Sequence, residues 1–564
     1  MNRIIITTSL LLILSAPSLF AQQQDIVRYN GTGNGMDEIK DMVIDGAGNV
    51  YVTGYADMGA SYFDYITIKY NTNGEKQWKA RYNGTGNGSD IPNAIFVDAN
   101  GNVYVTGASN RVSGAIFDLD ATTIKYSPQG VQLWVMRYDD ASHKTDGGND
   151  VIVDAAGNVY ITGYATITHG SSYARKDYLT IEYSASGAQL WLATFNGPVN
   201  NADDEAIGLG LDTDGNIYVS GTSFAGNDPD GEDDYLTIKY NPQGVQQWTA
   251  RYNGPVSEPD HATAMTVDKA GNSYVTGYSQ GISTDFDYAT VKYNSNGVQQ
   301  WVERYNGAEN GFDIPYDIAV DNSGNVYVTG SAETSLYNSD YSTIKYNSAG
   351  QQQWNSLYDG SGKARDEAHG LALDKNGNVY VTGYTTNRKF EWDIASVMYS
   401  SSGIKQAVRI YNGPKDSADV GNVIALDASG NVYIAGASTG RGTAWDFTVI
   451  KYSVSGGAPD PATNNTTAYE NLIQHSQQSF GILQISPNPV KEVANIRFHI
   501  ATDNKIKLMI YDANGNRVTV LKDGELKAGT YEAQWNTGNS LPGVYYCKLI
   551  GKEMQDVKRI VISR

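Results

Sequence analysis

The chain has 564 residues, with 60 Gly, 41 Tyr, 18% charged residues and a mean hydropathy of -0.41. It is too long for one ordinary domain, and its wealth of turn-forming and aromatic residues excludes a helical bundle and favours an all-β fold. Acidic residues outnumber basic ones by 61 to 41, giving a formal net charge of -20, so we expect no nucleic-acid partner.

The first 21 residues read MNRIIITTSLLLILSAPSLFA, a short basic start followed by an apolar run from Ile4 to Leu14. This pattern is typical of a secretory signal peptide (1–21), with cleavage expected near Ala21. The run is shorter than the ~20 apolar residues that span a bilayer, and no later segment is apolar enough to do so. We expect a mature chain without a membrane span, secreted or attached to the outer surface.

One motif, G-N-x-Y, recurs at intervals of 53 to 58 residues between residues 22 and 452. A fixed period of this size, just above that of the four-stranded blade repeats, predicts a β-propeller. The eight Asn of the motif are Asn49, Asn102, Asn158, Asn216, Asn272, Asn325, Asn378 and Asn431.

Each repeat predicts four strands, which we name inner, second, third and outer. In the repeat around Asn272, the pieces HATAMTVD, KAGNSYVTGYS, DYATVKYNSNG and VQQWVERYNG each alternate or run β-branched and aromatic before a turn cluster. Tyr293 and Trp301 lie four residues on either side of Gly297. We expect them to pair across this hairpin and to fill the contact between blades.

The order of the strands predicts how the ring closes. The chain begins with an outer strand, residues 25–31, and its repeats end with a third strand, residues 446–452. The first strand therefore completes the last blade, which removes an otherwise unpaired sheet edge. The alternative, seven blades with a spare repeat, leaves two edges open. Two outer strands lack the Trp, with Asp25 and Ala407 in its place, and the sequence gives no reason for this.

The repeats resemble the SBBP family of bacterial surface and secreted β-propellers. The resemblance lies in DxxGNVYVTG, for example residues 321–330, and in DYxTIKYNxxGxxxW, and it covers about residues 25–452. Family members are predicted to have seven blades, so eight repeats depart from that pattern. The resemblance implies the fold and no fixed activity.

After a linker rich in Pro, Gly, Asn, Ser and Gln (453–481), residues 482–564 predict about seven short strands, a small β-sandwich. This tail is similar to the type A sorting domain of the type IX secretion system, in Pro487-Asn-Pro489, in residues 510–515, in Ala528-Gly529 with Trp535, and in residues 543–546. The resemblance implies a Bacteroidetes-type organism. It also implies recognition of residues 482–564 by the type IX secretion machinery, and removal of the tail with release or surface attachment.

Candidate ligand-binding residues form a ring of aspartates. An Asp stands eight residues before the Asp of each D-x-x-G-N turn, where an acidic ring at the channel mouth would hold a cation or a polyhydroxylated ligand. The alternative interpretation is structural: each carboxylate accepts backbone N–H groups where the chain enters the inner strand. The eight residues are Asp37, Asp90, Asp146, Asp204, Asp260, Asp313, Asp366 and Asp419.

A second candidate is a calcium site in the loop NDPDGEDD, residues 227–234, which lacks EF-hand spacing. The alternative there is a solvated acidic loop. The candidate ligands are Asp228, Asp230, Glu232, Asp233 and Asp234.

No asymmetric catalytic set is visible in the sequence. Gly436-Ala-Ser-Thr-Gly440 matches G-x-S-x-G but follows a strand with no helix after it, so it is not a nucleophile elbow. We expect no catalytic residues and, apart from the calcium candidate, no cofactor. The sequence therefore predicts a binding or structural scaffold that holds a glycan or protein on its longer loops. The alternative is a hydrolase or lyase that acts on extracellular polysaccharide.

Overall fold

The computed structural model describes residues 23–59, 62–111, 119–168, 174–198, 202–225, 233–256, 258–335, 338–453, 481–486, 490–500, 504–512, 517–527, 529–538, 540–552 and 555–563. The predicted signal peptide and nearly all of the predicted linker lie outside these residues. The chain divides into two compact units, residues 1–457 and 458–564, and each is described by itself. In the described ranges no helix is long and apolar enough to cross a membrane.

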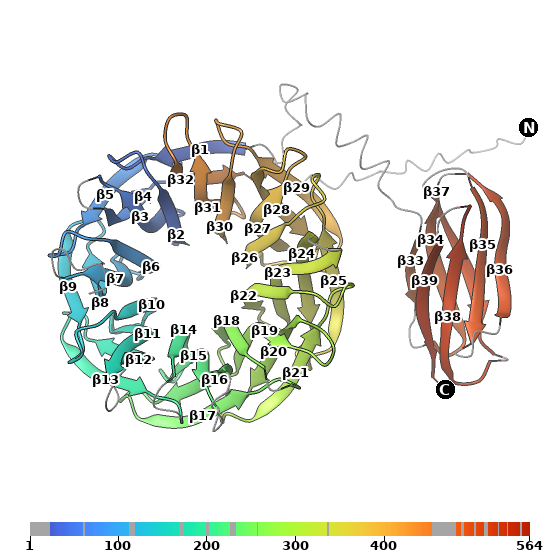
Figure 1. Ribbon diagram of the computed structural model, residues 1–564, viewed down its shortest axis with the longest axis horizontal. Coiled ribbons are helices and arrows are strands. Elements are labelled where there is room, and N and C mark those ends of the chain that lie inside the picture. The colour runs from blue at the N-terminus through green and yellow to red at the C-terminus, as the bar shows by residue number, and fades with distance from the viewer. Residues whose placement is uncertain are drawn as a thin grey trace, which may run out of the picture. The chain divides into compact units, whose positions relative to one another are not determined.

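The first unit is a propeller of eight four-stranded antiparallel sheets, the blades (Figure 1). Blade 1 contains β2 (Asp37–Ile44), β3 (Val50–Asp57), β4 (Phe63–Tyr70) and β5 (Lys76–Tyr82). Blade 2 contains β6 (Asp90–Val97), β7 (Val103–Asn110), β8 (Leu119–Tyr126) and β9 (Gln132–Tyr138). Blade 3 contains β10 (Gly147–Val153), β11 (Val159–Thr168), β12 (Ala174–Tyr183) and β13 (Gln189–Phe195). Blade 4 contains β14 (Asp204–Leu211), β15 (Ile217–Phe224), β16 (Asp233–Tyr240) and β17 (Gln246–Tyr252).

The next three blades repeat this order. Blade 5 contains β18 (Asp260–Val267), β19 (Ser273–Gln280), β20 (Phe286–Tyr293) and β21 (Gln299–Tyr305). Blade 6 contains β22 (Asp313–Val320), β23 (Val326–Ser335), β24 (Asn338–Tyr346) and β25 (Gln352–Tyr358). Blade 7 contains β26 (Glu367–Leu373), β27 (Val379–Thr386), β28 (Trp392–Tyr399) and β29 (Lys405–Tyr411).

Blade 8 is assembled from both ends of the propeller, which confirms the predicted closure. Its sheet has the order β1-β32-β31-β30, from β30 (Asp419–Leu426), β31 (Val432–Thr439), β32 (Trp445–Tyr452) and β1 (Gln23–Tyr29). β1 lies antiparallel to β32, with Val27 opposite Val449 and Tyr29 opposite Phe447. The eight blades and the sealed edge were both predictable from the strand count.

Fifteen tight hairpins share one geometry. In each, a Gly with φ between 73° and 92° occupies the fourth position of a five-residue turn. In residues 268–272, Asp268 Oδ1 accepts the N–H of Ala270 and of Asn272, both at 2.9 Å, and Gly271 N–H donates to the Asp268 carbonyl. Gly suits this position because a side chain in left-handed backbone costs about 1–2 kcal/mol.

The apolar core lies between neighbouring blades. Tyr51 and Tyr65 of blade 1, for example, pack with Val103, Val105 and Ile124 of blade 2. The buried Tyr of the third strand also reaches across the blade contact. Tyr178 Oη donates to the carbonyl of Leu236 in the next blade at 3.1 Å. This repeated use explains much of the high Tyr content.

The hairpin Trp contacts the next blade, and the predicted cross-hairpin pairing with Tyr is wrong. Trp78 lies opposite Lys69 in its own sheet, its ring centroid is 6.2 Å from that of Tyr126, and its Nε1 donates to the Pro128 carbonyl at 3.0 Å. A Cβ added to Gly130 would come within 2.6 Å of the Trp78 ring. Each of these hairpin Trp side chains thus packs on the third-to-outer hairpin of the following blade.

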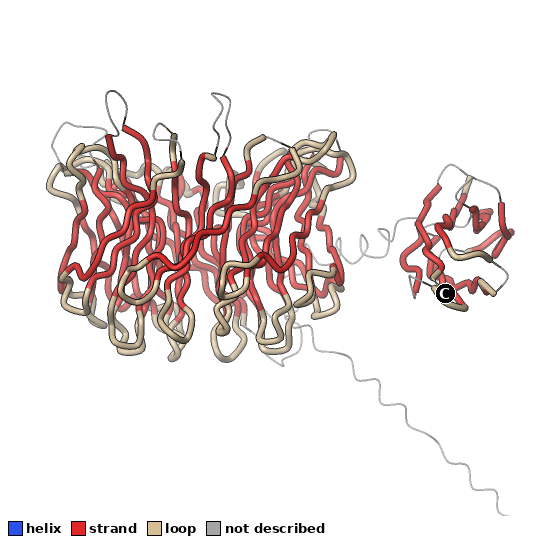
Figure 2. The backbone as a smooth tube through the Cα atoms, turned by 90° about the horizontal axis from the view of Figure 1, so that it is seen from below, coloured by secondary structure: helices blue, strands red, loops and turns tan. Residues whose placement is uncertain are grey.

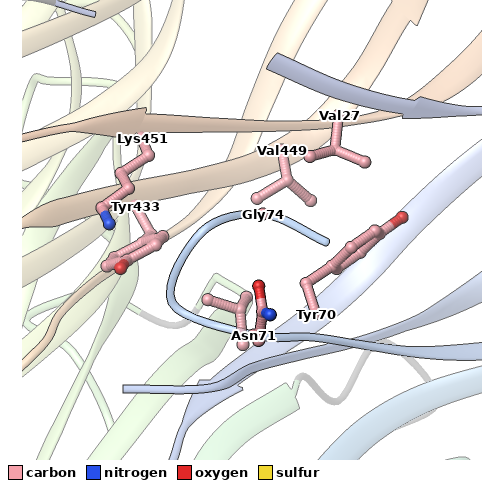
Figure 3. A pocket seen from close by; sticks show the side chains of 8 residues that line it. Val27, Tyr70, Asn71, Gly74, Tyr433, Val449 and Lys451 are labelled. Atoms are coloured by element: carbon pink, nitrogen blue, oxygen red, sulfur yellow. The ribbon is translucent and has the colours of Figure 1, made fainter. Parts of the chain in front are cut away.

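This contact explains why Ala407 replaces the Trp in one blade. In the other case, at Asp25, the structure shows a pocket near the position of the missing ring. The blade after Ala407 is blade 8, whose third and outer strands are not joined by a hairpin. A Trp at position 407 would therefore have no hairpin to pack on. The position opposite Lys451 in β1 is Asp25. Next to that position, between blades 8 and 1, a small pocket lies against the hairpin of blade 1 (Figure 3). It is lined by Val27, Val50, Tyr70, Asn71, Gly74, Tyr433, Val449 and Lys451.

The second unit has two sheets around one apolar core, as the sandwich pattern predicts. The sheets have the orders β33-β34-β37 and β36-β35-β38-β39. Core residues from both sheets include Phe498, Ile510, Trp535 and the buried free Cys547. The strands are β33 (Gly481–Ser486), β34 (Val493–Ile500), β35 (Asn504–Asp512), β36 (Arg517–Leu526), β37 (Gly529–Asn536), β38 (Gly543–Ile550) and β39 (Gln555–Ile562).

Candidate functional site

The propeller has two unlike layers of loops at the two ends of its strands (Figure 2). We call the end that carries the fifteen hairpins the turn face, and every hairpin there is five residues long. The other end, the long-loop face, carries the outer-to-inner and second-to-third loops, and the latter range from two to eight residues. The two kinds of loop are bonded together, as where Asp285 N–H donates to the Asn310 carbonyl at 3.0 Å. Variation between blades therefore concentrates on the long-loop face.

The eight candidate aspartates lie at the start of the inner strands beneath this face, and all are fully buried. Each accepts the backbone N–H of the second residue of the loop before it, for example that of Gly84 to Asp90 at 2.8 Å. In seven blades a second N–H, from the last residue of the second strand or two residues before it, also donates to the same carboxylate. These seven donors are Asp57, Asn110, Thr166, Phe224, Glu333, Thr386 and Thr439, at 2.8 to 3.2 Å.

These contacts are those of the structural interpretation, because seven of the eight carboxylates join the loop that enters the inner strand to the second strand of the same blade, and Asp260 accepts the N–H of Gly254 in its loop. A ligand would have to displace buried backbone hydrogen bonds to reach the oxygens. The geometry therefore gives no support to ligand binding at these eight residues, which stays a prediction. Burial raises the pKa of Asp37, Asp146 and Asp313 to about 7 and that of Asp90 and Asp366 to about 6, although the N–H donors act to lower it.

We expect the substitution Asp313→Ala to lower the free energy of unfolding by about 2 kcal/mol, because it leaves two buried N–H groups, those of Gly307 and Glu333, without their acceptor. Urea unfolding followed by circular dichroism measures the change. Glu309→Ala is the matched control, since it removes a carboxyl group from an exposed position of the same loop. Equal effects of the two substitutions would contradict a joining role for Asp313.

The calcium candidate is described only in part. Asp228, Asp230 and Glu232 lie outside the described residues. Asp234 is buried and forms an ion pair with Arg251 at 3.3 Å, and Asp233 Oδ2 lies 3.8 Å from His261 Nε2. Asp234 already has a cationic partner, so the contacts do not favour it as a calcium ligand. The site as a whole stays a prediction.

The blades differ in how they neutralise the buried Asp that opens the third strand. In five blades this Asp pairs with an outer-strand Arg, as Asp287 does with Arg304 at 3.0 Å. In blade 6 the Arg position holds Leu357, and Asp340 instead lies beside Asp359 and Asp366, with oxygens within 4.8 Å of one another. Three carboxylates are fewer than the six or more ligands that Ca²⁺ takes, so we assign no metal to this group or to the similar group Asp139, Asp140 and Asp146.

Blade 7 gathers reactive side chains that the sequence analysis did not single out. His369 Nε2 lies 3.4 Å from Glu367 Oε2, and the Arg365 guanidinium pairs with the other oxygen. Tyr316 Oη is 3.5 Å from Glu367 Oε2, and its ring centroid is 5.3 Å from that of His369. Burial acts to raise the pKa of Glu367, but His369 and Arg365 hold it below its ordinary value. The group thus contains a carboxylate that both an imidazole and a guanidinium contact.

Aromatic rings continue from this group to the surface. The ring of Tyr384 lies 5.6 Å from that of His369 and is stacked on Trp392, with centroids 4.6 Å apart and planes at 28°. Trp392 is 38% exposed and Phe390 is 76% exposed. Among the described residues of the propeller, the exposed aromatic side chains all lie on the long-loop face. They are Tyr62, Phe312, Phe390 and Trp392.

Two family models match the chain. A secretion system C-terminal sorting domain matches residues 484–563. A β-propeller repeat, SBBP, matches residues 77–111, 247–287, 300–337 and 356–391. No curated protein sequence matches the chain.

The chain is also similar to solved structures. One is a protein of unknown function from Bacteroides caccae (13% identity, TM-score 0.29, covering 54% of this chain and 93% of that one). Another is a protein of unknown function from Dyadobacter fermentans (9% identity, TM-score 0.35, 77% and 99%). A third is an ulvan lyase of polysaccharide lyase family PL25 (12% identity, TM-score 0.36, 70% and 94%).

The repeat matches agree with the eight four-stranded blades, and the sorting-domain match covers the second unit. Both resemblances seen in the sequence are thereby confirmed, and the sorting domain indicates secretion or attachment to the outer surface. The protein is a secreted β-propeller of SBBP repeats that carries a C-terminal sorting domain of the type IX secretion system.

Proposed function

We propose that the secreted propeller is a binding scaffold that holds an extracellular glycan or protein on its long-loop face, after export and cleavage near Ala21. The observation that carries the proposal is the placement of exposed aromatic rings on that face. On the turn face the exposed hydrophobic residues are aliphatic and recur at one hairpin position, as in Val131, Val245 and Val298. Exposed aromatics that break the repeat are typical of a recognition surface, since a ring offers a large apolar area with little entropy to lose.

The test uses the full chain on a glycan array and in a pull-down from extracellular material, each with and without calcium. We expect binding to be lost in the variant Tyr62→Ser, Phe312→Ser, Phe390→Ser, Trp392→Ser. The variant Val131→Ser, Val245→Ser, Val298→Ser is the matched control for lost apolar surface and should bind normally. Binding that fails only in the turn-face variant would overturn the proposal, as would the absence of binding in both assays.

A second candidate function, a hydrolase or lyase acting on polysaccharide, is supported by the contact of His369 with Glu367 beside Arg365. An imidazole next to a charged carboxylate is an arrangement suited to proton transfer. Incubation of the protein with polysaccharides, followed by measurement of new reducing ends and of unsaturated products, tests it. Activity that disappears in His369→Ala would favour an enzyme over a scaffold.

A further inference from the structure

The charge of the long-loop face is uneven. Six basic side chains are exposed on the four loops of blades 7 and 8, and we call these loops (359–366, 387–391, 412–418 and 440–444) the basic sector. In the described parts of the corresponding loops of blades 1, 4, 5 and 6 there is no Lys or Arg. The six residues are Lys363, Arg365, Arg388, Lys389, Lys415 and Arg441.

Contacts between the loops make the basic sector one continuous surface. Loop 359–366 is bonded to the end of β27 through Gly362 and Thr386. Lys389 of the next loop forms an ion pair with Asp416, and Arg365 is paired with Glu367, so two of the six positive charges already have a carboxylate partner. Arg441 Nε donates to the Pro414 carbonyl at 3.0 Å, which leaves its terminal nitrogens for other partners. The cations are therefore held on neighbouring loops of one surface.

Phe390 is an exposed residue of the basic sector with an unfavourable backbone conformation. Its loop, residues 387–391, repeats the hydrogen bonds of the fifteen turn-face hairpins: Asn387 N–H donates to the Glu391 carbonyl and Phe390 N–H to the Asn387 carbonyl. Phe390 thus stands where all fifteen hairpins have Gly, and its φ is 62°. A bulky residue in this region is strained, and such strain points to function. The side chain gains little burial in return, since it is 76% exposed.

We propose that the basic sector, with Phe390 and Trp392 as its aromatic platform, binds an anionic polysaccharide, a chain of sugars that carry carboxylate or sulfate groups. The proposal deepens the proposed function and rests on it. The apolar faces of sugar rings would lie on the two aromatic side chains, and the anionic groups would contact Arg388, Lys415 and Arg441.

The net charge of the chain does not oppose such a ligand at contact range. At physiological ionic strength the Debye length is about 8 Å, so the ligand senses the local cations more than the acidic blades across the ring. The net charge of the whole chain, from which the sequence analysis argued against a polyanionic partner, is an average and does not describe the local charge of this sector. A nucleic acid shares the negative charge but not the apolar ring faces, and it becomes one outcome of the test.

The experiment measures binding of the full chain to polygalacturonate, dextran sulfate, neutral dextran and single-stranded DNA. We expect binding to polygalacturonate, dextran sulfate or both, and we expect it to weaken as salt rises. The variant Arg388→Glu, Lys415→Glu should lose at least tenfold in affinity. The variant Lys269→Glu, Lys375→Glu makes the same change in net charge at exposed turn-face positions and should bind as the wild type does.

Phe390→Gly separates a ligand-binding role from a structural one. It should lower the affinity for the same probe at least tenfold while raising the melting temperature, because Gly relieves the strain. A lower melting temperature would mean that Phe390 is structural and would overturn its assignment. Binding to dextran that the charge variants do not change would overturn the anionic ligand while leaving the proposed function intact. Preference for DNA, or equal losses in both charge variants, would also overturn the inference.

Discussion

The substitution Arg28→Ala is expected to lower the free energy of unfolding by about 3 kcal/mol, because it removes the guanidinium of β1 that pairs with the buried Asp446 carboxylate of blade 8. The Arg28 guanidinium donates to the Ser438 hydroxyl and carbonyl, both at 2.6 Å, and to Asp446 Oδ2 at 2.9 Å. It also donates to Tyr411 Oη of blade 7 at 3.1 Å. Without Arg28, the buried Asp446 carboxylate loses this counter-charge, and the strand that closes the ring loses its side-chain bonds to Ser438 and Tyr411.

Blade 5 offers a matched control for this experiment. Arg304 makes the same set of contacts, with the Ser279 hydroxyl and carbonyl, Asp287 and Tyr252, but its strand is joined to its blade by a hairpin. We expect Arg304→Ala to cost about as much as Arg28→Ala in urea unfolding. A large cost for Arg304→Ala with none for Arg28→Ala would show that β1 does not pair with β32 in solution.

The architecture was predictable because the residues within each repeat are enough to indicate its four strands and its turns. Alternating strands, the Gly of each hairpin and a surplus outer strand at the start of the chain were enough to derive eight blades and the closure. The packing of each Trp on the next blade was not predictable in this way. Trp78 contacts Gly130 and Pro128 of the next blade, and sequence spacing within one repeat cannot show a contact between repeats.

The candidate site was predicted less well, for a related reason. The ring of aspartates stands out in the sequence because it repeats, and its members are engaged with the backbone. A Glu directly after the ring Asp recurs in three repeats, as Glu38, Glu205 and Glu367, but a His three residues after it occurs once, at His369. The outer strands of blades 6 and 7 carried a signal, because they depart from the repeat: Leu357 and Ile410 stand where five blades have Arg. Phe390 was hidden because only the backbone shows that it occupies a glycine position.

The pH dependence of stability should be larger than the effect of any single substitution above: we expect the protein to become more stable as the pH falls from 8 to 5. Burial raises the pKa of five ring aspartates from 3.8 to about 6 or 7. Their folded state therefore holds protons that the unfolded chain releases. This contribution is complete below the unfolded pKa and is lost as the pH rises through 6 to 7. One pKa unit corresponds to about 1.4 kcal/mol. The summed effect of the five shifts on the free energy of unfolding therefore stays large even if screening by solvent reduces each of them strongly.

The melting temperature measured from pH 3 to pH 8 in 0.5 M NaCl tests this, because the salt screens the general repulsion of an acidic chain and leaves the buried groups. Below about pH 4 the slope should reverse. Burial acts to raise the pKa of the turn residue Asp45, but its hydrogen bonds from Asn49 hold it below the ordinary value, as also happens at Asp98, Asp212 and Asp321. Stability gained from these groups is lost as they protonate, so we expect a maximum between about pH 4 and 6. Asp313→Ala should flatten the slope between pH 5 and 8, and a melting temperature that rises from pH 5 to 8 would show that the ring carboxylates are ionised in the folded protein.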